Sequence, residues 1–393
     1  MQYWSITTKQ MRKIVFNSLI LATRFVALLV VLLSGLVSPV HSLQSDSKKE
    51  DKKKKTEPFK ITRLTQGLGL YAIGDVSPNG ESIFLLAQKA NEAPNLYVMK
   101  LADPSIRPPL TSFKLGVANP HWSADGKLAA FAGYVATASF PEIFVLDLAG
   151  GKQRQLTSNQ FSDTDPVFTP DGKKILYTSD ESPLPDAAFG TLHVASVAVG
   201  GGKPEAFTED EGSSIKPSIS SDGKSVLLVK VSEQTGRHSL WQYGFDGKAQ
   251  RDLTERKFAR IHTYINNPAN GSIVFWAQQE AEEHDNVYVL DLKSGEIRSL
   301  PDDDMVKKRP SLSPDGLRIA FISPTEAGDH LFVFDSTSGE IKQITSKPSN
   351  DHSPSFVSNH EIIFGSDRDK VPELYLVDLD QPADSKKGEE KKK

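Results

Sequence analysis

The sequence predicts an all-β fold, a seven-bladed β-propeller of four-stranded antiparallel blades that is closed by the N-terminal strand. Three observations predict it. A short phrase recurs along the 393 residues at a nearly constant period, each repeat has the same order of strands and turns, and the two ends of the array complement each other. A period in this range is typical of propeller blades.

The recurring phrase ends in Leu-Thr or a near variant. Its last residues are Thr65, Thr111, Thr157, Thr208, Thr254, Pro301 and Thr345. Successive positions lie 46, 46, 51, 46, 47 and 44 residues apart. Because this regularity extends over most of the chain, we expect one radial array of blades rather than two or three unrelated domains.

Within a repeat, the predicted elements follow one order. The sixth repeat has a first strand, a turn and three further strands, at Arg309–Leu312, Ser313–Gly316, Leu317–Ser323, His330–Asp335 and Glu340–Thr345. In the turn, proline presets φ, aspartate bonds its own backbone and glycine takes a positive φ, so the strands reverse tightly. Equivalent turns lie at residues 77–80, 123–126, 169–172, 220–223 and 268–271, whereas the seventh repeat has Val357–His360 without glycine.

The second strands are continuous apolar runs, at Ile83–Ala87, Ile175–Tyr177, Val226–Val229, Ile273–Trp276, Ile319–Ile322 and Ile362–Phe364. Such strands need cover on both faces, which a blade receives from its two neighbours. The seventh repeat ends after its third strand near Leu379, and Ile61–Thr65 is a fourth-strand phrase with no blade before it. The N-terminal strand is therefore predicted to pair with the last blade and to remove its exposed edge.

Residues 1–42 are predicted to be a signal peptide, because basic residues precede the apolar run Phe25–Val37 and short side chains lead to a cleavage point after Ser42. An uncleaved membrane anchor stays open as the alternative, since the stretch Ile14–Val37 is long enough to span a bilayer, although Asn17 and Arg24 interrupt its apolar run. Both interpretations predict an exported protein, periplasmic or extracellular. We assign residues 43–58 to a lysine-rich disordered linker, 59–380 to the propeller and 381–393 to a disordered charged tail.

Composition excludes several kinds of chemistry and partner. No cysteine is present, which excludes disulfides, thiolate metal sites and cysteine nucleophiles. The net charge is −4, and without the four basic residues of the signal peptide the balance is 42 basic against 50 acidic residues, or −8. This excess of acid argues against nucleic acid as a partner. The G-x-S-x-G motif of serine hydrolases does not occur in the sequence.

Three segments carry a family resemblance: Asn119–Phe131, Asp165–Tyr177 and Arg309–Phe321. They resemble the propeller repeats of TolB, and they are similar to the propellers of the prolyl-oligopeptidase and dipeptidyl-peptidase IV group and of oligogalacturonate lyases. The resemblance covers about residues 59–380. It departs from TolB in two respects, because TolB has an α/β domain before its propeller and that propeller has six blades.

The lyase resemblance implies a metal held by histidines over the central channel. The candidates are His121, His262 and His352, but their offsets from the turns differ, so they do not share a register. No cofactor is predicted, with calcium left open because Asp163–Asp165 and Asp302–Asp304 offer oxygen ligands.

Binding residues are predicted at the channel mouth, where the loops before the first strand and between the second and third strands share one face. Counting seven residues back from each turn glycine, or its equivalent, gives a predicted inner ring of Ile73, Asn119, Asp165, Lys216, Tyr264, Arg309 and Ser353. Two residues earlier, on the same side of each strand, lie Tyr71, Val117, Asp163, Ser214, His262, Lys307 and Asp351. The predicted binding residues are Asp163, Asp165, Lys216, His262, Arg309 and Asp351.

The longest loop between a second and a third strand spans residues 179–190, and its Phe189 is predicted to contact a partner. Together these features predict a noncatalytic, monomeric propeller that binds a protein, peptide or glycan partner in the bacterial cell envelope through its channel-mouth face. A metal-dependent polysaccharide lyase of the oligogalacturonate type, or a sugar-binding relative, is the alternative. The membrane enters only through an uncleaved N-terminal anchor.

Overall fold

The computed structural model describes residues 57–88, 92–135, 140–181, 191–255, 257–280, 282–301 and 304–383. These residues belong to one compact unit, Lys55–Lys393. They form strands, and none of their segments is a helix that could cross a membrane. The predicted signal peptide, the predicted linker up to residue 56 and residues 384–393 of the predicted tail lie outside the described residues.

Antiparallel sheets follow one another along the chain, as predicted. The first consists of β2 (Leu70–Val76), β3 (Ser82–Ala87) and β4 (Asn95–Lys100). The second consists of β5 (Val117–Trp122), β6 (Leu128–Tyr134), β7 (Pro141–Asp147) and β8 (Gln153–Gln155). The third consists of β9 (Asp163–Phe168), β10 (Lys174–Ser179), β11 (His193–Ala198) and β12 (Glu205–Ala206).

Two further groups of four strands share one sheet, joined by a single pair, His238 with Phe258. One group is β13 (Ser213–Ile219), β14 (Val226–Val231), β15 (His238–Tyr243) and β16 (Ala249–Asp252). The other is β17 (Phe258–Asn266), β18 (Ile273–Gln279), β19 (Asn286–Leu290) and β20 (Ile297–Ser299).

The last two sheets complete the described chain. One consists of β21 (Lys308–Leu312), β22 (Arg318–Thr325), β23 (Gly328–Asp335) and β24 (Glu340–Gln343). The other consists of β25 (Asp351–Phe356), β26 (Glu361–Ser366) and β27 (Glu373–Pro382), with β1 (Phe59–Arg63) as its fourth strand. The N-terminal strand therefore pairs with the last strand of the chain.

The first sheet has three strands where four were predicted. The phrase that ends at Thr111 reaches β4 through hydrogen bonds alone, from Leu110 N to Leu96 O at 2.7 Å and from Leu96 N to Thr111 Oγ1 at 3.0 Å. Three prolines between residues 104 and 109 precede the phrase. Because proline lacks a backbone N–H, this segment cannot continue a ladder.

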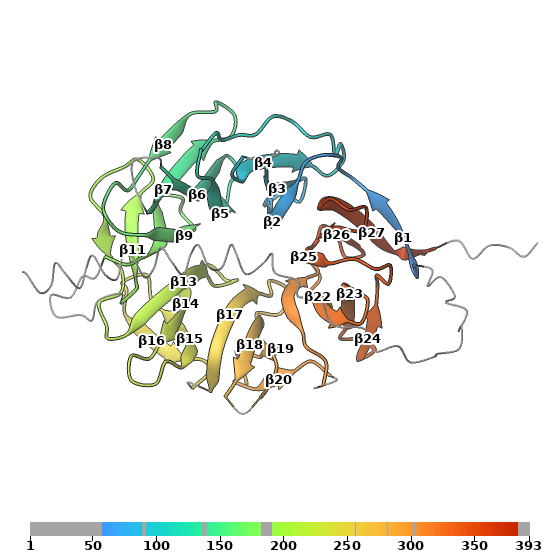
Figure 1. Ribbon diagram of the computed structural model, residues 1–393. Helices are drawn as coiled ribbons and strands as arrows, with labels where there is room; N and C mark the ends of the chain where they lie inside the picture. Colours follow the sequence, from blue (N-terminus) through green and yellow to red (C-terminus); the bar gives the residue numbers. More distant parts are fainter. Residues whose placement is uncertain are drawn as a thin grey trace, which may run out of the picture. The chain divides into compact units, whose positions relative to one another are not determined.

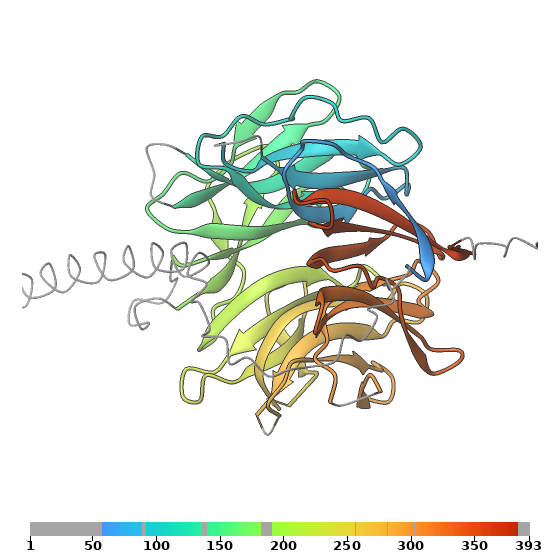
Figure 2. The ribbon, with the colours of Figure 1, turned by 45° about the vertical axis from the view of Figure 1, so that its right-hand side comes forward.

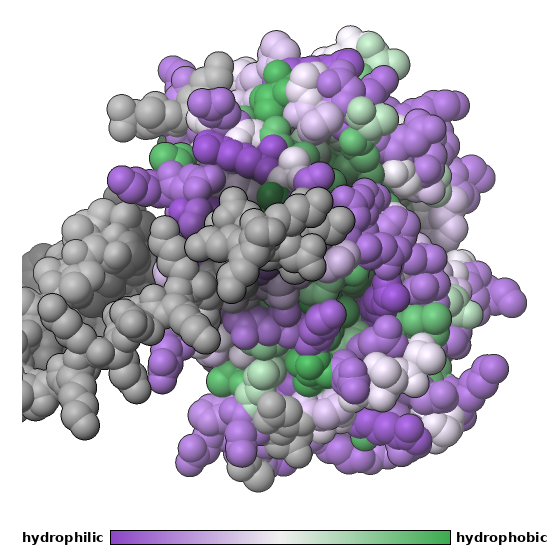
Figure 3. Space-filling view, turned by 90° about the vertical axis from the view of Figure 1, so that its right-hand side faces the viewer, coloured by the Kyte–Doolittle hydropathy of each residue, from purple (hydrophilic) through white to green (hydrophobic). Residues whose placement is uncertain are grey.

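The sheets are arranged around a common centre like propeller blades (Figure 1, Figure 2). First strands of successive sheets contact each other, in the pairs β2 with β5, β5 with β9, β9 with β13, β17 with β21, and β21 with β25. β25 in turn contacts β2. On the face drawn in Figure 3, polar residues predominate and apolar residues appear in smaller patches.

The hydrophobic core lies between neighbouring sheets. Phe84 of β3 belongs to a buried cluster with Phe131 of β6, in the second sheet. The next residue, Leu85, belongs to a different cluster, with Ile363 of β26 in the last sheet. Since successive residues of a strand point to opposite faces, β3 is covered on both sides. The predicted two-sided burial of the second strands is confirmed.

The Leu-Thr phrase recurs because its threonine completes a hydrogen bond in the sheet. In six places the buried threonine Oγ1 accepts the backbone N–H of a third-strand residue, at 2.9 or 3.0 Å. The pairs are Thr111 with Leu96, Thr157 with Ile143, Thr208 with Val194, Thr254 with Leu240, Thr345 with Leu331, and Thr65 with Leu374. The last pair lies 309 positions apart in the sequence, so the segment directly after β1 gives β27 the same bond that five other third strands receive locally.

Candidate functional site

A cavity of about 870 Å³ lies at the centre of the sheets. All seven first strands contribute to its lining, β2, β5, β9, β13, β17, β21 and β25, with several of the turns that follow them. Serine, threonine, proline and apolar residues make up most of the lining, and its two ionisable residues are Asp75 and His121. This turn end of the channel is nearly uncharged and offers hydroxyl groups beside apolar surface.

His121 and Asp75 form the polar corner of that cavity. His121 Nε2 lies 3.7 Å from Asp75 Oδ2, and both side chains are exposed. The neighbouring Trp122 donates from Nε1 to the backbone oxygen of Asp75 at 2.9 Å and stacks on Phe84 with ring centroids 3.8 Å apart. The indole therefore holds the ends of β2 and β5 together beside His121 and Asp75.

The predicted inner ring lies at a bulge in the first strands. In β5, β9, β13, β21 and β25 the pairing with the second strand skips at this position. The bulged residues have a positive φ of 48–55° and are Asn119, Asp165, Lys216, Arg309 and Ser353. A proline follows each of them but not Ile73 or Tyr264. Proline has no N–H to leave unpaired at an interrupted ladder, and a bulge redirects the adjacent side chain.

Side chains of the inner ring link one first strand to the next. Asn119 Nδ2 donates to Asp165 Oδ1 at 2.9 Å. Lys216 Nζ donates to the backbone oxygen of His262, and Tyr264 OH donates to the backbone oxygen of Lys216 at 2.6 Å. Burial raises the pKa of Asp165, and the positive charge of Lys216 acts in the opposite direction. The structure thus brings Asp165, Lys216 and His262 into one row.

His262 and Arg309 come from the next two first strands, β17 and β21. His262 Nε2 lies 3.0 Å from Asp285 Oδ1, and its ring stacks on Trp276 with centroids 4.1 Å apart. Arg309 is exposed, and its guanidinium has no hydrogen-bond or ion-pair partner among the described residues. Burial, and then the charge of Arg309, lower the pKa of the neighbouring His352. Arg309 is therefore an unpaired, exposed cation at the bulge of β21, within the described part of the chain.

Asp163, in contrast, is completely buried in the third sheet. Its carboxylate accepts hydrogen bonds from Ser179 Oγ at 2.6 Å and Asn159 Nδ2 at 3.1 Å. Burial raises the pKa of Asp163 to about 6. These contacts direct the carboxylate into the sheet.

Asp351 is likewise buried, in the last sheet. It accepts hydrogen bonds from Thr345 Oγ1 and Ser366 Oγ, both at 2.5 Å, and from Arg368 Nη2 at 3.0 Å. Sequence counting placed Asp163 and Asp351 beside His262, but it could not show that their oxygens are already occupied. The predicted partner contact, Phe189, lies outside the described residues.

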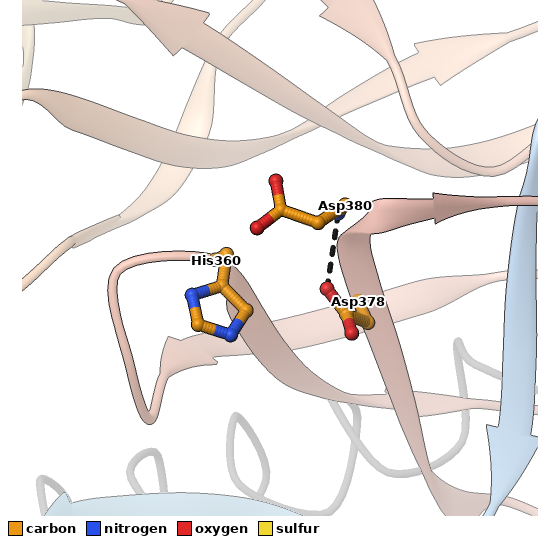
Figure 4. A group of neighbouring side chains, drawn as sticks. All are labelled: His360, Asp378 and Asp380. Carbon is orange, nitrogen blue, oxygen red and sulfur yellow. Dashed lines mark hydrogen bonds between the residues drawn. The ribbon is translucent and has the colours of Figure 1, made fainter.

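The three histidines considered for a lyase metal do not meet. His121 pairs with Asp75, His262 with Asp285, and His352 Nδ1 lies 3.3 Å from Ser353 Oγ. Within the described ranges, one group brings three metal-binding side chains together, and it consists of His360, Asp378 and Asp380 in the last sheet (Figure 4). The sequence alone did not predict this group, although the glycine-free turn Val357–His360 was a signal. Of the predicted calcium ligands, Asp302 and Asp303 lie outside the described residues.

Comparison with known sequences identifies the repeat. A family model for the TolB beta propeller domain matches residues 59–284 and 246–389. The uncharacterized protein Atu1656 of Agrobacterium fabrum is 26% identical over 265 residues, which cover 64% of this chain and 84% of that protein. The Tol-Pal system protein TolB of Francisella tularensis subsp. holarctica is 22% identical over 213 residues, 54% of this chain. That match spans 46% of TolB, less than half of its length.

Solved structures share the architecture. An oligogalacturonate lyase in complex with manganese superposes with a TM-score of 0.63 at 16% identity, covering 83% of this chain and 94% of the lyase. A puromycin hydrolase superposes with a TM-score of 0.64 at 14% identity, covering 82% of this chain and 55% of the hydrolase. At such low identity these likenesses show the fold alone, because many activities share it.

Proposed function

Since this chain belongs to the TolB beta propeller domain family, we propose that it is an exported, noncatalytic propeller that binds a protein, peptide or glycan partner in the bacterial cell envelope through its channel-mouth face. The family match supports the propeller scaffold. Export rests on the predicted signal peptide at residues 1–42, with periplasmic or extracellular localisation as its consequence.

The scaffold that we propose is a closed ring of seven blades. Its support is that residues of seven first strands line one cavity and that β25 contacts β2. The pairing of β1 with β27 supports closure at the point where the ring begins and ends. A closed ring holds its loops on a rigid frame, which is the setting in which propeller loops bind partners.

The observation that carries the proposed binding role is the row of charged and polar side chains at the bulges. Asp165, Lys216 and His262 come from three consecutive first strands, and Arg309 follows on β21. Bulges with positive φ hold three of these four residues, Asp165, Lys216 and Arg309. Charges of both signs on a fixed frame suit a partner with a complementary polar surface, since such complementarity gives specificity.

Arg309 provides the sharpest test, because it is exposed and no described residue pairs with it. We expect Arg309→Glu to reduce crosslinking to the envelope partner in intact cells without lowering the melting temperature. Arg154→Glu, on the outer strand β8, is the matched control and should leave crosslinking unchanged. Deletion of residues 182–190 tests the contribution of Phe189 in the same experiment. Equal capture by the parent, Arg309→Glu and the loop deletion would reject the channel-mouth face as the binding surface.

The alternative function is a metal-dependent polysaccharide lyase or a sugar-binding relative, since an oligogalacturonate lyase in complex with manganese shares this fold. Against it stands the separation of His121, His262 and His352, each with a different partner. Incubation of the purified protein with manganese and oligogalacturonate decides between the two. Appearance of unsaturated uronate products would replace the noncatalytic proposal, and binding of the sugar without product would identify a glycan partner.

A further inference from the structure

Three side chains converge at the end of the last sheet. His360 lies in the turn that leads into β26, and Asp378 and Asp380 lie on β27. One ligand atom from each residue lies within 4.8 Å of the other two. Figure 4 shows the imidazole and the two carboxylates around one space, with Asp380 N donating to Asp378 Oδ1 at 3.0 Å.

The turn that carries His360 differs from the other first turns. Residues 357–360 separate β25 from β26, four residues, whereas residues 313–317, five residues, separate β21 from β22. Leu379 N donates to the backbone oxygen of His360 at 2.8 Å, which places the histidine opposite residues 378–380. The imidazole nitrogens have no hydrogen-bond partner among the described residues, so both remain available as ligands.

An irregularity in β27 brings the two aspartates to the same place. Ile61 of β1 pairs with Val377, and Phe59 pairs with Pro382, so residue 60 faces the four residues 378–381. Asp378 and Asp380 are two residues apart on this bulged segment, a spacing that puts side chains on one face of a strand. Gln381 Nε2 donates to Asp378 Oδ2 at 2.8 Å, which orients the carboxylate.

The charges of the cluster are uncompensated in the described part of the chain. Two carboxylates lie within 4.8 Å of each other, and the ion pairs of the last sheet involve Arg63, Lys347 and Arg368 with other acids. Like charges at this separation repel. A bound cation removes the repulsion and uses the remaining lone pairs of both carboxylates.

From this geometry we propose that His360, Asp378 and Asp380 bind a divalent transition metal, with Zn²⁺ as the best fit. Imidazole selects transition metals over calcium and magnesium, which prefer oxygen ligands alone. Zn²⁺ accepts histidine nitrogen and aspartate oxygen, and three protein ligands with one water complete a tetrahedral site. Zinc binding at this site requires neither the central channel nor the partner that we propose for the channel-mouth face.

The metal has a structural consequence for the joint between the chain ends. Pro382 pairs with Phe59, and Ala383 N donates to Pro58 O at 3.2 Å, directly after the bulged segment. A metal that joins His360 to Asp378 and Asp380 fastens this end of β27 to the turn before β26. It therefore stabilises the segment to which the N-terminal strand pairs, and metal binding adds to the stability of the folded state by mass action.

Calorimetric titration of the untagged, chelator-treated full chain with ZnCl₂ tests the proposal, together with the visible spectrum of the Co²⁺ form and the melting temperature with and without zinc. We expect one Zn²⁺ per chain and a higher melting temperature with zinc. His360→Ala and Asp380→Asn should each weaken zinc binding by more than about tenfold. Even the loss of a residue that only hydrogen-bonds a metal ligand costs at least about tenfold in metal affinity. His284→Ala, which removes an exposed histidine beside carboxylates, is the matched control and should bind as the parent does.

Two results would overturn the site. One is that the parent protein binds zinc no more tightly than the His360→Ala variant does. The other is that zinc still raises the melting temperature of Asp380→Asn. This variant should keep the fold, because residue 380 is exposed. If His360→Ala itself melts at a lower temperature without metal, the Asp380→Asn titration decides the question.

Discussion

Asp163 and Asp165 lie two residues apart on β9, but their surroundings differ. Asp163 is fully buried and accepts hydrogen bonds from Ser179 of its own sheet and from Asn159 in the connection that leads into β9. Asp165, at the bulge, accepts a hydrogen bond from Asn119 of the neighbouring sheet. The comparison shows that the position before the bulge belongs to the sheet, whereas the bulged position belongs to the channel wall.

Buried carboxylates recur on the sheet side of this division. Glu142 accepts from Thr157 Oγ1 at 2.7 Å, Asp351 from Thr345 Oγ1 and Glu373 from Thr65 Oγ1, both at 2.5 Å. We call Glu142, Asp163, Asp351 and Glu373 the seam carboxylates. Three of them bind the threonine of a Leu-Thr phrase, so they fix the fourth-strand segment to its sheet.

The largest expected effect of a single substitution is at Asp351. Asp351→Ala removes one of two carboxylate partners from the Arg368 guanidinium, whose side chain is 4% exposed and which keeps Glu57 Oε1 at 3.0 Å. Because one acidic partner remains, the loss of unfolding free energy should lie near the lower end of the about 3–5 kcal/mol that breaking a buried ion pair costs. Urea unfolding measures the loss. Ser353→Ala, two residues away at the bulge, should change stability by less than about 0.5 kcal/mol, and equal values for the two variants would remove the distinction between sheet and channel wall.

The raised pKa of Asp163 predicts that the stability of the protein depends on pH. Burial raises the pKa of this carboxyl to about 6 in the folded protein from the ordinary value of 3.8, so the folded state holds the proton more tightly. Stability associated with this group is present below about pH 4 and is lost as pH rises toward 6, by about 3 kcal/mol for a shift of this size. Asp163→Asn should lose less stability than the parent over this range. Parallel curves for the two proteins, measured by urea unfolding, would contradict the assignment.

The smallest expected effect on stability is at Arg309. Its side chain is exposed and unpaired among the described residues, so Arg309→Glu should shift the unfolding free energy by less than about 0.5 kcal/mol. A larger shift would mean that Arg309 contributes to the stability of its sheet, as the seam carboxylates do, and would contradict its assignment to the channel wall. The same variant serves the crosslinking experiment, where a large effect is expected.

Much of the fold follows from local patterns in the sequence. The Leu-Thr spacing predicted the sheets because its threonine makes a local hydrogen bond, and the turns were predicted from glycine and aspartate. Counting back from the turns also located the bulge, since the residues at that position in five repeats precede a proline. The first sheet was the exception, because the prolines before Thr111 prevent a fourth strand.

The different surroundings of Asp163 and Asp165 could not be predicted from local sequence patterns. They depend on Ser179 and Asn119, which other strands bring to β9. The cluster of His360 with Asp378 and Asp380 was missed for a related reason. Seventeen residues lie between His360 and Asp378 in the sequence, and only the pairing of β26 with β27 brings the two together.

The central claim is that the N-terminal strand completes the last sheet. Deleting residues 59–66 removes Phe59 from a buried cluster, Thr65 from the backbone N–H of Leu374, and a partner from the buried Glu373. A variant that lacks residues 43–56 instead keeps β1 and serves as the control. Thermal unfolding followed by circular dichroism should show a much lower melting temperature for the first deletion and an unchanged one for the second. Melting of both deletions at the temperature of the parent would contradict the claim.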